Sequence, residues 1–422
     1  MLGGMTRSFG YFDQHRREYV ITDPITPEPW INYLDGNGKM NAFISNGAGG
    51  IAWYDQPHTG RLTRYRLNGL PMDSPGFYLY IKDGVDIWNP SFFPTMKKLD
   101  SWECRHGMLQ VFSNAKTGGE TVMLAEQFIY ASKLLVEILR HSGKAEEISF
   151  FEKKSRDFSE VLASDVCWDG GWFKRLLYPD AELGSRKNKE GKIFLNTQSW
   201  AAMAGSLPAA KVRKAMDNVS EMLDTECGIR LFSPPFTTMM DGVTRFHTNT
   251  PGAGENGGLF LHANTWAIIA ETMQGNTQRA WKYFSQIMPN NLSARNPEHY
   301  GREPYAFASW VYGPDHVAFG HAALTWLTGG AAWTYIAGTE YILGIRPTLD
   351  GLLISPCIPA DWEKFEIQRN VRGSTYRITV LNPDRIGCGK VDLTVDGSPV
   401  KGNLVPYAPS GKTVEVRAVV YK

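Results

Sequence analysis

The sequence lacks the patterns that mark several large classes of protein. Its 422 residues contain no stretch of about 18 consecutive apolar residues, so no membrane-spanning helix is predicted. Its 44 Lys and Arg residues are balanced by 43 Asp and Glu residues, so charge gives no reason to expect nucleic acid or an anionic membrane as a partner. The motifs GxSxG, Walker A and HExxH are absent as well. The composition, 43% hydrophobic and 21% charged, is that of an ordinary globular protein.

Cysteine is also scarce. The chain has five, at wide spacings and without a CxxC pair. This pattern indicates neither a zinc site nor a disulfide framework, so we expect reduced thiols and no metal. No organic cofactor is expected either. The N-terminal stretch has no apolar segment of the kind found in signal peptides, and the cytoplasm is therefore the expected compartment.

Aromatic residues, by contrast, are abundant. The chain has 13 Trp, 18 Tyr and 21 Phe. Tryptophan rings often stack on the flat apolar faces of sugars, but a large aromatic core would give the same composition. Composition alone leaves both interpretations open.

The pattern along the chain predicts an α+β multidomain protein in the order β, α, β. Residues 1–112 hold short strand-like runs such as FGYF, REYVIT, FYLYIK and MLQVFS, separated by Gly- and Pro-containing turns, and this predicts part of a β-sandwich. Residues 344–422 predict a small C-terminal β domain. Its strand-like runs are ISPCIPADW, FEIQRNV, STYRITVLNP, KVDLTVDG and KTVEVRAVVY.

The middle part, residues 113–343, is predicted to be helical. Apolar residues recur at helical spacing from Glu120 to Arg140. Further helices are expected over residues 145–164, 196–205, 208–224, 262–273, 276–287 and 317–342. Helices alternating with long Gly/Pro-bearing loops suit a toroid of helical hairpins, with the loops at one end.

Two glycine-rich loops carry polar side chains suited to an anion. In PGAGENGGLFLHANTW (residues 251–266), Glu255 and Asn256 precede a helix predicted to begin near His262, where free N–H groups and the helix dipole favour a negative charge. In TWLTGGAAW (residues 325–333), a threonine stands next to two glycines and could form a phosphate nest. A tight turn with a capping Asn and a buried His explains the first loop as well, and a helix start packed on its neighbour explains the second.

A third segment, REPYAFASWVYGPD (residues 302–315), combines carboxylates with aromatic rings. Glu303 and Tyr305 could bind sugar hydroxyls and ring faces, although an ordinary aromatic loop would look the same. Carboxylate pairs break glycosidic bonds, but linear spacing cannot pair the candidates Asp169, Glu255, Glu303 and Asp315. The run CWDGGW around Asp169 is interpreted as a packed structural turn.

Several of these segments together resemble one known family. The quoted loops, with FGYFDQHRREYVIT, PEPWINYL, ISNGAGG, RYRLNGLPMDSPGFYLYIKD, TQSWAAMAG and EYILGIRPTLDGLLISPCIPADW, are similar to the cellobiose phosphorylase family of inverting glycoside phosphorylases, of the glycoside hydrolase family 94 type. The resemblance implies an N-terminal β-sandwich, an (α/α)6 barrel and a C-terminal β domain, usually in a homodimer. It covers most of the chain.

The resemblance also implies a reaction and a site. The family cleaves a β-glucosyl disaccharide with inorganic phosphate as co-substrate, giving α-glucose 1-phosphate and an acceptor sugar, while one carboxylic acid protonates the leaving oxygen. Its phosphate contacts carry over onto His262, Thr328 and Gly329. Glu255 and Asn256 fall in its acceptor-side loop, and Glu303 and Tyr305 are further expected substrate contacts.

The chain departs from the family in one decisive place. The family's Trp-Asn-Asp motif, which supplies the general acid, occurs nowhere here, so no catalytic residue is assigned. The sandwich motifs stop and late-barrel motifs begin between residues 107 and 117, which indicates a large internal deletion and a partial barrel. We therefore expect an inactive phosphorylase of the cellobiose type. The alternatives are a non-catalytic carbohydrate-binding remnant and, because Gly254 and Ser309 stand where the family commonly has Lys and Gln, a phosphorylase acting on cellobionic acid.

Overall fold

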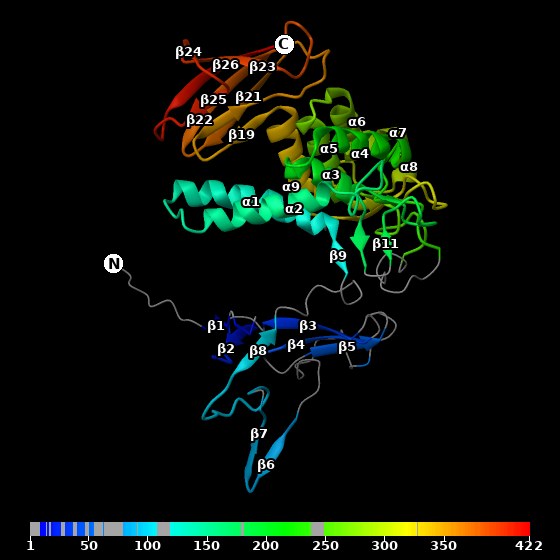
Figure 1. The fold of residues 1–422 in the computed structure, drawn as a ribbon, viewed down its shortest axis with the longest axis vertical. Helices are drawn as coiled ribbons and strands as arrows, with labels where there is room; N and C mark the ends of the chain where they lie inside the picture. The colour runs from blue at the N-terminus through cyan, green and yellow to red at the C-terminus, as the bar shows by residue number, and fades with distance from the viewer. Residues whose placement is uncertain are drawn as a thin grey trace. The chain divides into compact units, whose positions relative to one another are not determined.

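The computed structural model describes residues 9–13, 15–16, 18–26, 30–36, 40–46, 50–54, 62, 79–90, 92–107, 119–178, 181–237, 249–326 and 328–422 (Figure 1). The described residues up to Gly107 lie in one compact unit and those from Gly119 onward in a second. The predicted strand MLQVFS, the predicted boundary after residue 112 and most of the predicted deletion junction lie outside the described residues.

The first unit consists of small antiparallel sheets. In the sheet of β1 (Gly10–Asp13), β2 (Glu18–Ile21) and β8 (Cys104–Gly107), the central strand β2 buries Val20 and Ile21 completely. The second sheet is a meander of β3 (Ile31–Gly36), β4 (Met40–Ser45) and β5 (Gly50–Tyr54). The third is a hairpin of β6 (Ile81–Asp83) and β7 (Asp86–Trp88), so only the end of the predicted run FYLYIK is seen in a strand.

The second unit contains the helices. They are α1 (Val122–His141), α2 (Ile148–Ala163), α3 (Leu195–Ala204), α4 (Ala209–Met222), α5 (Leu261–Met273), α6 (Thr277–Ile287), α7 (Pro289–Arg295), α8 (Pro297–Tyr300), α9 (Gly330–Ile336) and the π-helix η3 (Ala337–Ile342). The first six predicted helices are confirmed within a few residues. The short helices α7 and α8 were not predicted, and each begins at a proline, which favours the first helical position.

The predicted helix over residues 317–342 is wrong in its first half. Residues Ala322–Thr325 form strand β18, which pairs with β17 (Ala308–Val311). Helical structure starts only at Gly330. Pairing with a distant strand therefore overrides the local helical pattern of this segment.

Short two-residue strands connect the helices. They are β9 (Glu120–Thr121), β10 (Leu176–Leu177), β11 (Glu182–Leu183), β12 (Ile193–Phe194), β13 (Asp224–Thr225), β14 (Gly228–Ile229), β15 (Phe232–Ser233) and β16 (Leu259–Phe260). Among the residues that the structure describes, no helix has the length and apolar character needed to cross a membrane.

The main helices alternate between two layers. Helix α1 packs on α2 and α3, α3 packs on α4 and α5, and α5 packs on α6 and α9. Every residue of α3 except Asn196 is buried, whereas α4 buries a single stripe of Val212, Ala215, Met216 and Val219. A helix buried all round belongs to an inner layer and one with a single apolar stripe to an outer layer. Helices α3 and α5 are therefore inner, and α4 and α6 cover them.

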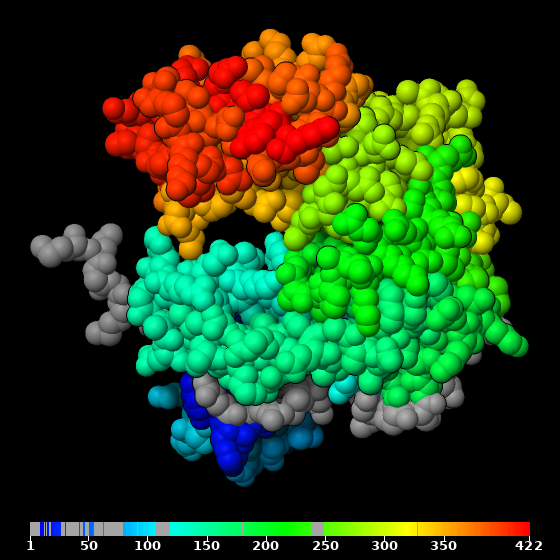
Figure 2. Space-filling view, turned by 45° about the horizontal axis from the view of Figure 1, so that its top comes forward, coloured from blue at the N-terminus to red at the C-terminus, as the bar shows by residue number. Residues whose placement is uncertain are grey.

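The α1–α2 hairpin carries large apolar side chains at its surface. Figure 2 shows this hairpin (cyan to green) along one flank of the second unit. Leu124, Leu134, Ile138, Phe150 and Val161 are each 46–57% exposed. Apolar groups that are gathered on one hairpin and left in water are typical of a face that packs against a partner.

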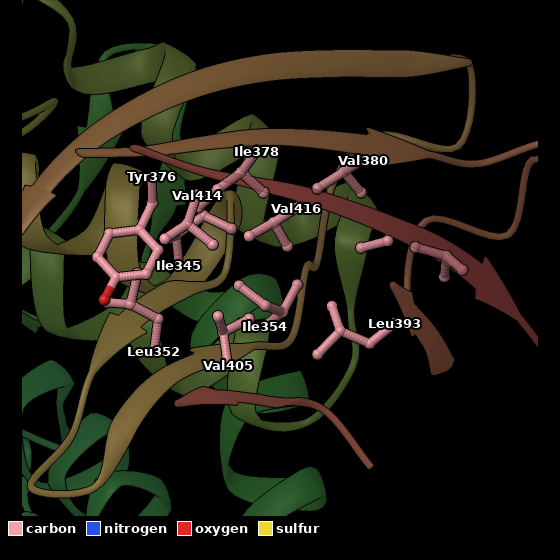
Figure 3. Packing of buried hydrophobic residues seen from close by; sticks show 12 residues of the cluster. Ile345, Leu352, Ile354, Tyr376, Ile378, Val380, Leu393, Val405, Val414 and Val416 are labelled. Carbon is pink, nitrogen blue, oxygen red and sulfur yellow. The ribbon is translucent and has the colours of Figure 1, made fainter. Parts of the chain in front are cut away.

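The chain ends in two β-sheets with a shared core. One has the order β21 (Lys364–Val371), β22 (Ser374–Leu381), β26 (Thr413–Tyr421), β23 (Lys390–Val395) and β24 (Ser398–Val400). The other contains β19 (Ile345–Pro347), β20 (Gly351–Ile354) and β25 (Leu404–Pro406). Alternate residues of β22, among them Tyr376 and Ile378, point into the core that Figure 3 shows, opposite Ile354 and Val405.

One predicted C-terminal strand is wrong. In ISPCIPADW only Ile354 lies in a strand, and residues 355–362 form an irregular connection. Pro356 and Pro359 lack the N–H that a ladder requires, which explains why this apolar run does not pair.

Candidate functional site

The small sheet of β16, β17 and β18 brings two helix starts to the same place. Strand β17 pairs antiparallel with both neighbours, through Phe260 with Trp310 and through Trp310 with Ala323. Strands β16 and β18 therefore run in the same direction and end at the same edge of the sheet. Helix α5 begins directly after β16, and α9 begins five residues after β18.

The three expected anion contacts meet at this edge. A β-carbon built on Gly329 would lie 3.5 Å from Cε1 of His262. One built on Gly330 would lie 3.0 Å from the Thr328 hydroxyl and 3.4 Å from the His262 backbone nitrogen, so a larger residue would fit only if these neighbours moved by a few tenths of an ångström. The Gly330 N–H donates to Oγ1 of Thr328 over 2.9 Å. Residues 66 positions apart in the chain (262 and 328) thus share one site.

The environment of His262 keeps its imidazole neutral. The side chain is half-buried, and burial lowers its pKa. Its ring centre lies 4.7 Å from that of Trp266, which in turn lies 5.3 Å from that of Trp200. A neutral imidazole carries one N–H, and an anion bound beside it would favour the protonated ring and raise this pKa.

Three ring nitrogens in this cluster are buried and without a hydrogen-bond partner in the part of the chain that the structure describes. They are Nε2 of His262, Nε1 of Trp200 and Nε1 of Trp266. Each unpaired buried donor costs about 1–3 kcal/mol, so such groups usually meet a water molecule or a ligand. Their concentration around His262 identifies this edge as the leading candidate for ligand binding.

The loop before α5 has a rigid fold of its own. Gly258 packs so closely that a β-carbon there would lie 2.6 Å from the carbonyl oxygen of Gly254. Asn256 is fully buried, and its side chain donates to the carbonyls of Phe236 and Asn249 and accepts from the Phe236 N–H, over 2.8–2.9 Å. The expectation that Asn256 contacts substrate needs correcting, because its amide is used inside the protein. It holds the loop that carries the half-buried Glu255.

Glu303 and Tyr305 lie together beside Trp326. The Trp326 indole donates to Oε1 of Glu303 over 3.1 Å, and the rings of Tyr305 and Trp326 are 6.4 Å apart. Tyr305 is 75% and Trp326 is 70% exposed. The pKa of Glu303 is lowered, first by its own backbone N–H and then by the indole. Glu303 therefore stays a carboxylate and suits hydrogen bonding rather than proton donation.

An open hollow of about 520 Å³ adjoins this group. Its lining includes Gly301, Arg302, Glu303, Leu324 and Thr325. Sequence reasoning missed Trp326, which links this hollow to Thr328 two residues later. Its backbone has φ of 68°, which is uncommon outside glycine and is typical of functional positions. No feature of the sequence indicates that φ value.

The other candidate carboxylates, Asp169 and Asp315, form ion pairs with arginines of the protein itself. Asp169 accepts from the Arg186 backbone N–H over 2.6 Å and pairs with the Arg186 side chain over 3.3 Å. In the same turn the Trp172 indole donates to two backbone carbonyls, which agrees with the interpretation of CWDGGW as structural. Asp315 pairs with Arg230 over 3.5 Å.

Comparison with protein families matches both parts of the chain. Residues 17–125 match the Glycosyl hydrolase 94 supersandwich domain, and residues 88–344 match the catalytic domain of the Glycosyl hydrolase 94 superfamily. The sheets of the first unit fall largely in the former match and the helices α1–α9 in the latter. The expected N-terminal sandwich portion and helical catalytic part agree with these matches.

Individual relatives are disaccharide phosphorylases of greater length. A solabiose phosphorylase from Paenibacillus borealis is 36% identical over 71% of this chain and 39% of that protein. An N,N'-diacetylchitobiose phosphorylase from Vibrio proteolyticus is 33% identical over 69% of this chain and 36% of that protein. A cellobionic acid phosphorylase from Neurospora crassa is 28% identical over 60% of this chain and 32% of that protein.

The matched region thus spans less than two-fifths of each of these relatives, as the large internal deletion inferred from the motifs would require. The catalytic-domain match alone covers more than half of the chain. This chain therefore belongs to the glycosyl hydrolase 94 family of glycoside phosphorylases.

Proposed function

We propose that this chain holds inorganic phosphate at His262, Thr328 and Gly329 as part of a glycoside phosphorylase site. The observation that carries the proposal is the meeting of these residues at the common edge of β16 and β18. An imidazole N–H and a threonine hydroxyl are both donors that suit phosphate oxygens. The N-terminus of the thirteen-residue helix α5 adds a favourable dipole.

The chemistry that such a site serves is phosphorolysis with inversion. A phosphate oxygen attacks the anomeric carbon of a β-glucosyl unit, the bond to the leaving oxygen breaks, and α-glucose 1-phosphate forms. The leaving oxygen needs a proton, and a positioned acid contributes about 10²–10⁴-fold to such a step. Since the Trp-Asn-Asp motif is absent, we infer that the chain binds phosphate and sugar without turning them over.

The sugar side of the site is formed by the open hollow next to Trp326, which Arg302 and Glu303 line, and by the loop that carries Glu255. Exposed aromatic rings beside the Glu303 carboxylate suit stacking on a sugar ring and bonding to its hydroxyls. Cellobiose is the substrate that we propose first. Cellobionic acid is the second candidate, because Arg302 lines the same hollow and could pair with an aldonate carboxylate.

The arrangement of the helices supports a partial (α/α)6 barrel. The pairs α1–α2, α3–α4 and α5–α6, with α3 and α5 on the inside, would make three of the six hairpins of such a ring. We further infer a homodimeric, cytoplasmic protein with a small C-terminal β domain, as the family resemblance implies.

We expect His262→Gln to weaken phosphate binding at least tenfold. The exchange replaces an imidazole that a bound anion would protonate with an amide that stays neutral, and a hydrogen bond to a charged group is worth about 1.5–3 kcal/mol. Isothermal titration calorimetry with sodium phosphate measures the affinity. The matched control is His141→Gln, because His141 is exposed at the end of α1. Equal affinity in parent and His262→Gln, or no heat from the parent, would contradict the proposed phosphate site.

We also expect no synthesis of disaccharide. The assay follows phosphate release from α-glucose 1-phosphate with glucose, or with gluconate, as acceptor. Robust turnover would show that another carboxyl replaces the missing acid. Calorimetry with cellobiose and with cellobionic acid then decides between the two sugars, and failure of both would reject the sugar site while leaving the phosphate result intact.

A further inference from the structure

Two cysteines far apart in the sequence lie side by side in the second unit. The Ile358 N–H donates to the Gly387 carbonyl over 3.0 Å, which places the backbones at Cys357 and Cys388 next to each other. The two thiols also act on each other, because a hydrogen bond between them is the largest cause of the shift in the pKa of each. Both cysteines are reduced in this structure.

Both backbone segments are firmly held. The Cys357 N–H donates to the carbonyl of Ile342 at the end of η3 over 2.8 Å. On the other side, the fully buried Asn382 accepts from the N–H groups of Ile386 and Gly387 over 3.0–3.1 Å. The backbones that carry the two cysteines are therefore held next to each other by the fold.

The two thiols differ in access and in acidity. Cys357 is only 2% exposed, whereas Cys388 is half-buried near the α5–α6 turn, where a β-carbon on Gly275 would lie 3.6 Å from its sulfur. The hydrogen bond from Cys357 lowers the pKa of Cys388 to about 7 against the effect of burial. The same hydrogen bond, followed by burial, raises the pKa of Cys357.

Glu271 is the other titratable group that acts on the pair, through its charge on Cys357. It is fully buried and lies 3.1 Å from Nε of Arg279.

The pKa values of the three remaining cysteines are shifted in the opposite direction to that of Cys388. Burial raises the pKa of Cys104, of Cys167 (to about 11) and of Cys227. Because the thiolate is the reactive form, these three should react slowly near neutral pH. Cys388 is thus the one nucleophilic thiol among the five, and it has a second thiol in contact.

We propose that Cys388 and Cys357 form a peroxide-reactive dithiol that closes into a reversible disulfide. The Cys388 thiolate attacks one oxygen of hydrogen peroxide, the O–O bond breaks, and the departing hydroxide takes up a proton to give water and a sulfenic acid on Cys388. The Cys357 sulfur then attacks the Cys388 sulfur, the S–O bond breaks, and the proton of Cys357 leaves with the hydroxyl as a second water. Two thiols are oxidised and one peroxide is reduced.

The disulfide would join the connection after β20 to the loop between β22 and β23. Cys357 lies in the segment that leads from the three-stranded sheet to β21, so the bond would tie that segment to the loop before β23 of the five-stranded sheet. A cross-link of this kind restricts the unfolded chain. We expect the thermal midpoint of the oxidised chain to exceed that of the reduced chain.

The test uses the full chain treated with stoichiometric hydrogen peroxide and mapped by peptide mass spectrometry. We expect a Cys357–Cys388 cross-linked peptide that dithiothreitol separates again. Sulfinic acid at Cys388 without the cross-link, or no reaction at Cys388, would overturn the proposal.

A second measurement tests whether Cys357, rather than the burial of Cys388 alone, determines the pKa of the Cys388 thiol. The rate of alkylation of Cys388 by iodoacetamide, followed against pH, should have its midpoint near 7 in the parent chain. In Cys357→Ala, which has no donor at this position, the midpoint should rise toward about 8.5, the ordinary thiol value, whereas Cys227→Ala should leave it unchanged. A parent midpoint at the ordinary value, or one that Cys357→Ala does not move, would contradict the pairing. The peroxide mapping requires no variant and therefore does not depend on how Cys357→Ala folds.

Discussion

Replacing Asn264 with leucine is expected to lower the free energy of unfolding by about 3 kcal/mol and to eliminate phosphate binding. Asn264 is fully buried in the first turn of α5. Its side chain accepts from the Ile229 N–H over 2.6 Å and donates to the Ile229 carbonyl over 2.9 Å and to the Phe260 carbonyl over 3.0 Å. Leucine has a similar size but no polar atom, so both backbone groups of Ile229 would be buried without a partner, at about 1–3 kcal/mol each.

The functional effect follows from where these bonds lie. Asn264 fastens β14 and β16 to the helix start that carries His262. Without these hydrogen bonds, the sheet edge that brings His262 to Gly329 is no longer held in place. A displacement of about 1 Å is enough to weaken the affinity of a binding site substantially. In the sequence Asn264 is only a polar residue near the predicted start of a helix, whereas the structure shows that it bonds to a neighbouring strand.

Urea unfolding followed by tryptophan fluorescence, with calorimetry for phosphate, measures both effects. Asn290→Leu is the matched control, since Asn290 is exposed on α7 and a surface substitution should stay within about 0.5 kcal/mol. An Asn264→Leu chain with parental stability would show that the Ile229 groups find other partners. If that variant bound phosphate as tightly as the parent, phosphate binding would not depend on the position of the start of α5.

An element of the fold could be predicted from the sequence when local residues determine it, and could not when distant contacts do. Among the six helices that were predicted, α1, α2, α4 and α6 have a one-sided apolar period that the local sequence specifies, whereas α3 and α5 are buried nearly all round and lack one. Residues 322–325 were placed in a helix because their strand exists only through pairing with Ala308–Val311, a contact that no local pattern records. The prolines that start α7 and α8 were visible, but these helices are too short for a period to appear.

The candidate site divides in the same way. His262, Thr328 and Gly329 could be named from two loops and a family resemblance, and parallel strand ends bring them together in space. Asn256 was named for its polar side chain in a glycine-rich loop, but its burial depends on Phe236, which is distant in sequence. Trp326 was missed because its exposure and its positive φ are properties of the folded chain.

The second large effect is a loss of stability as the pH rises through neutrality. Glu271 is fully buried in α5, and burial raises its pKa to about 7, against the opposing charge of Arg279. In the unfolded chain the same carboxyl titrates near 4.5. Between these two values the folded chain holds a proton that the unfolded chain has released. Stability is therefore highest below the unfolded pKa and falls as the pH passes through the folded one, by about 3 kcal/mol in all at 1.36 kcal/mol per pKa unit.

Glu271→Gln should remove this part of the pH dependence. Glutamine keeps the shape and stays neutral, and Arg279 retains its ion pair with Asp217 at 2.7 Å. At pH 8 the variant should exceed the parent in unfolding free energy, whereas at pH 5 the two should be close. Urea unfolding at both pH values measures the difference, with Glu298→Gln on the surface of α8 as the control. A parental slope in Glu271→Gln would mean that the proton resides elsewhere. The first group to examine would be Glu126, whose complete burial in α1 also raises its pKa.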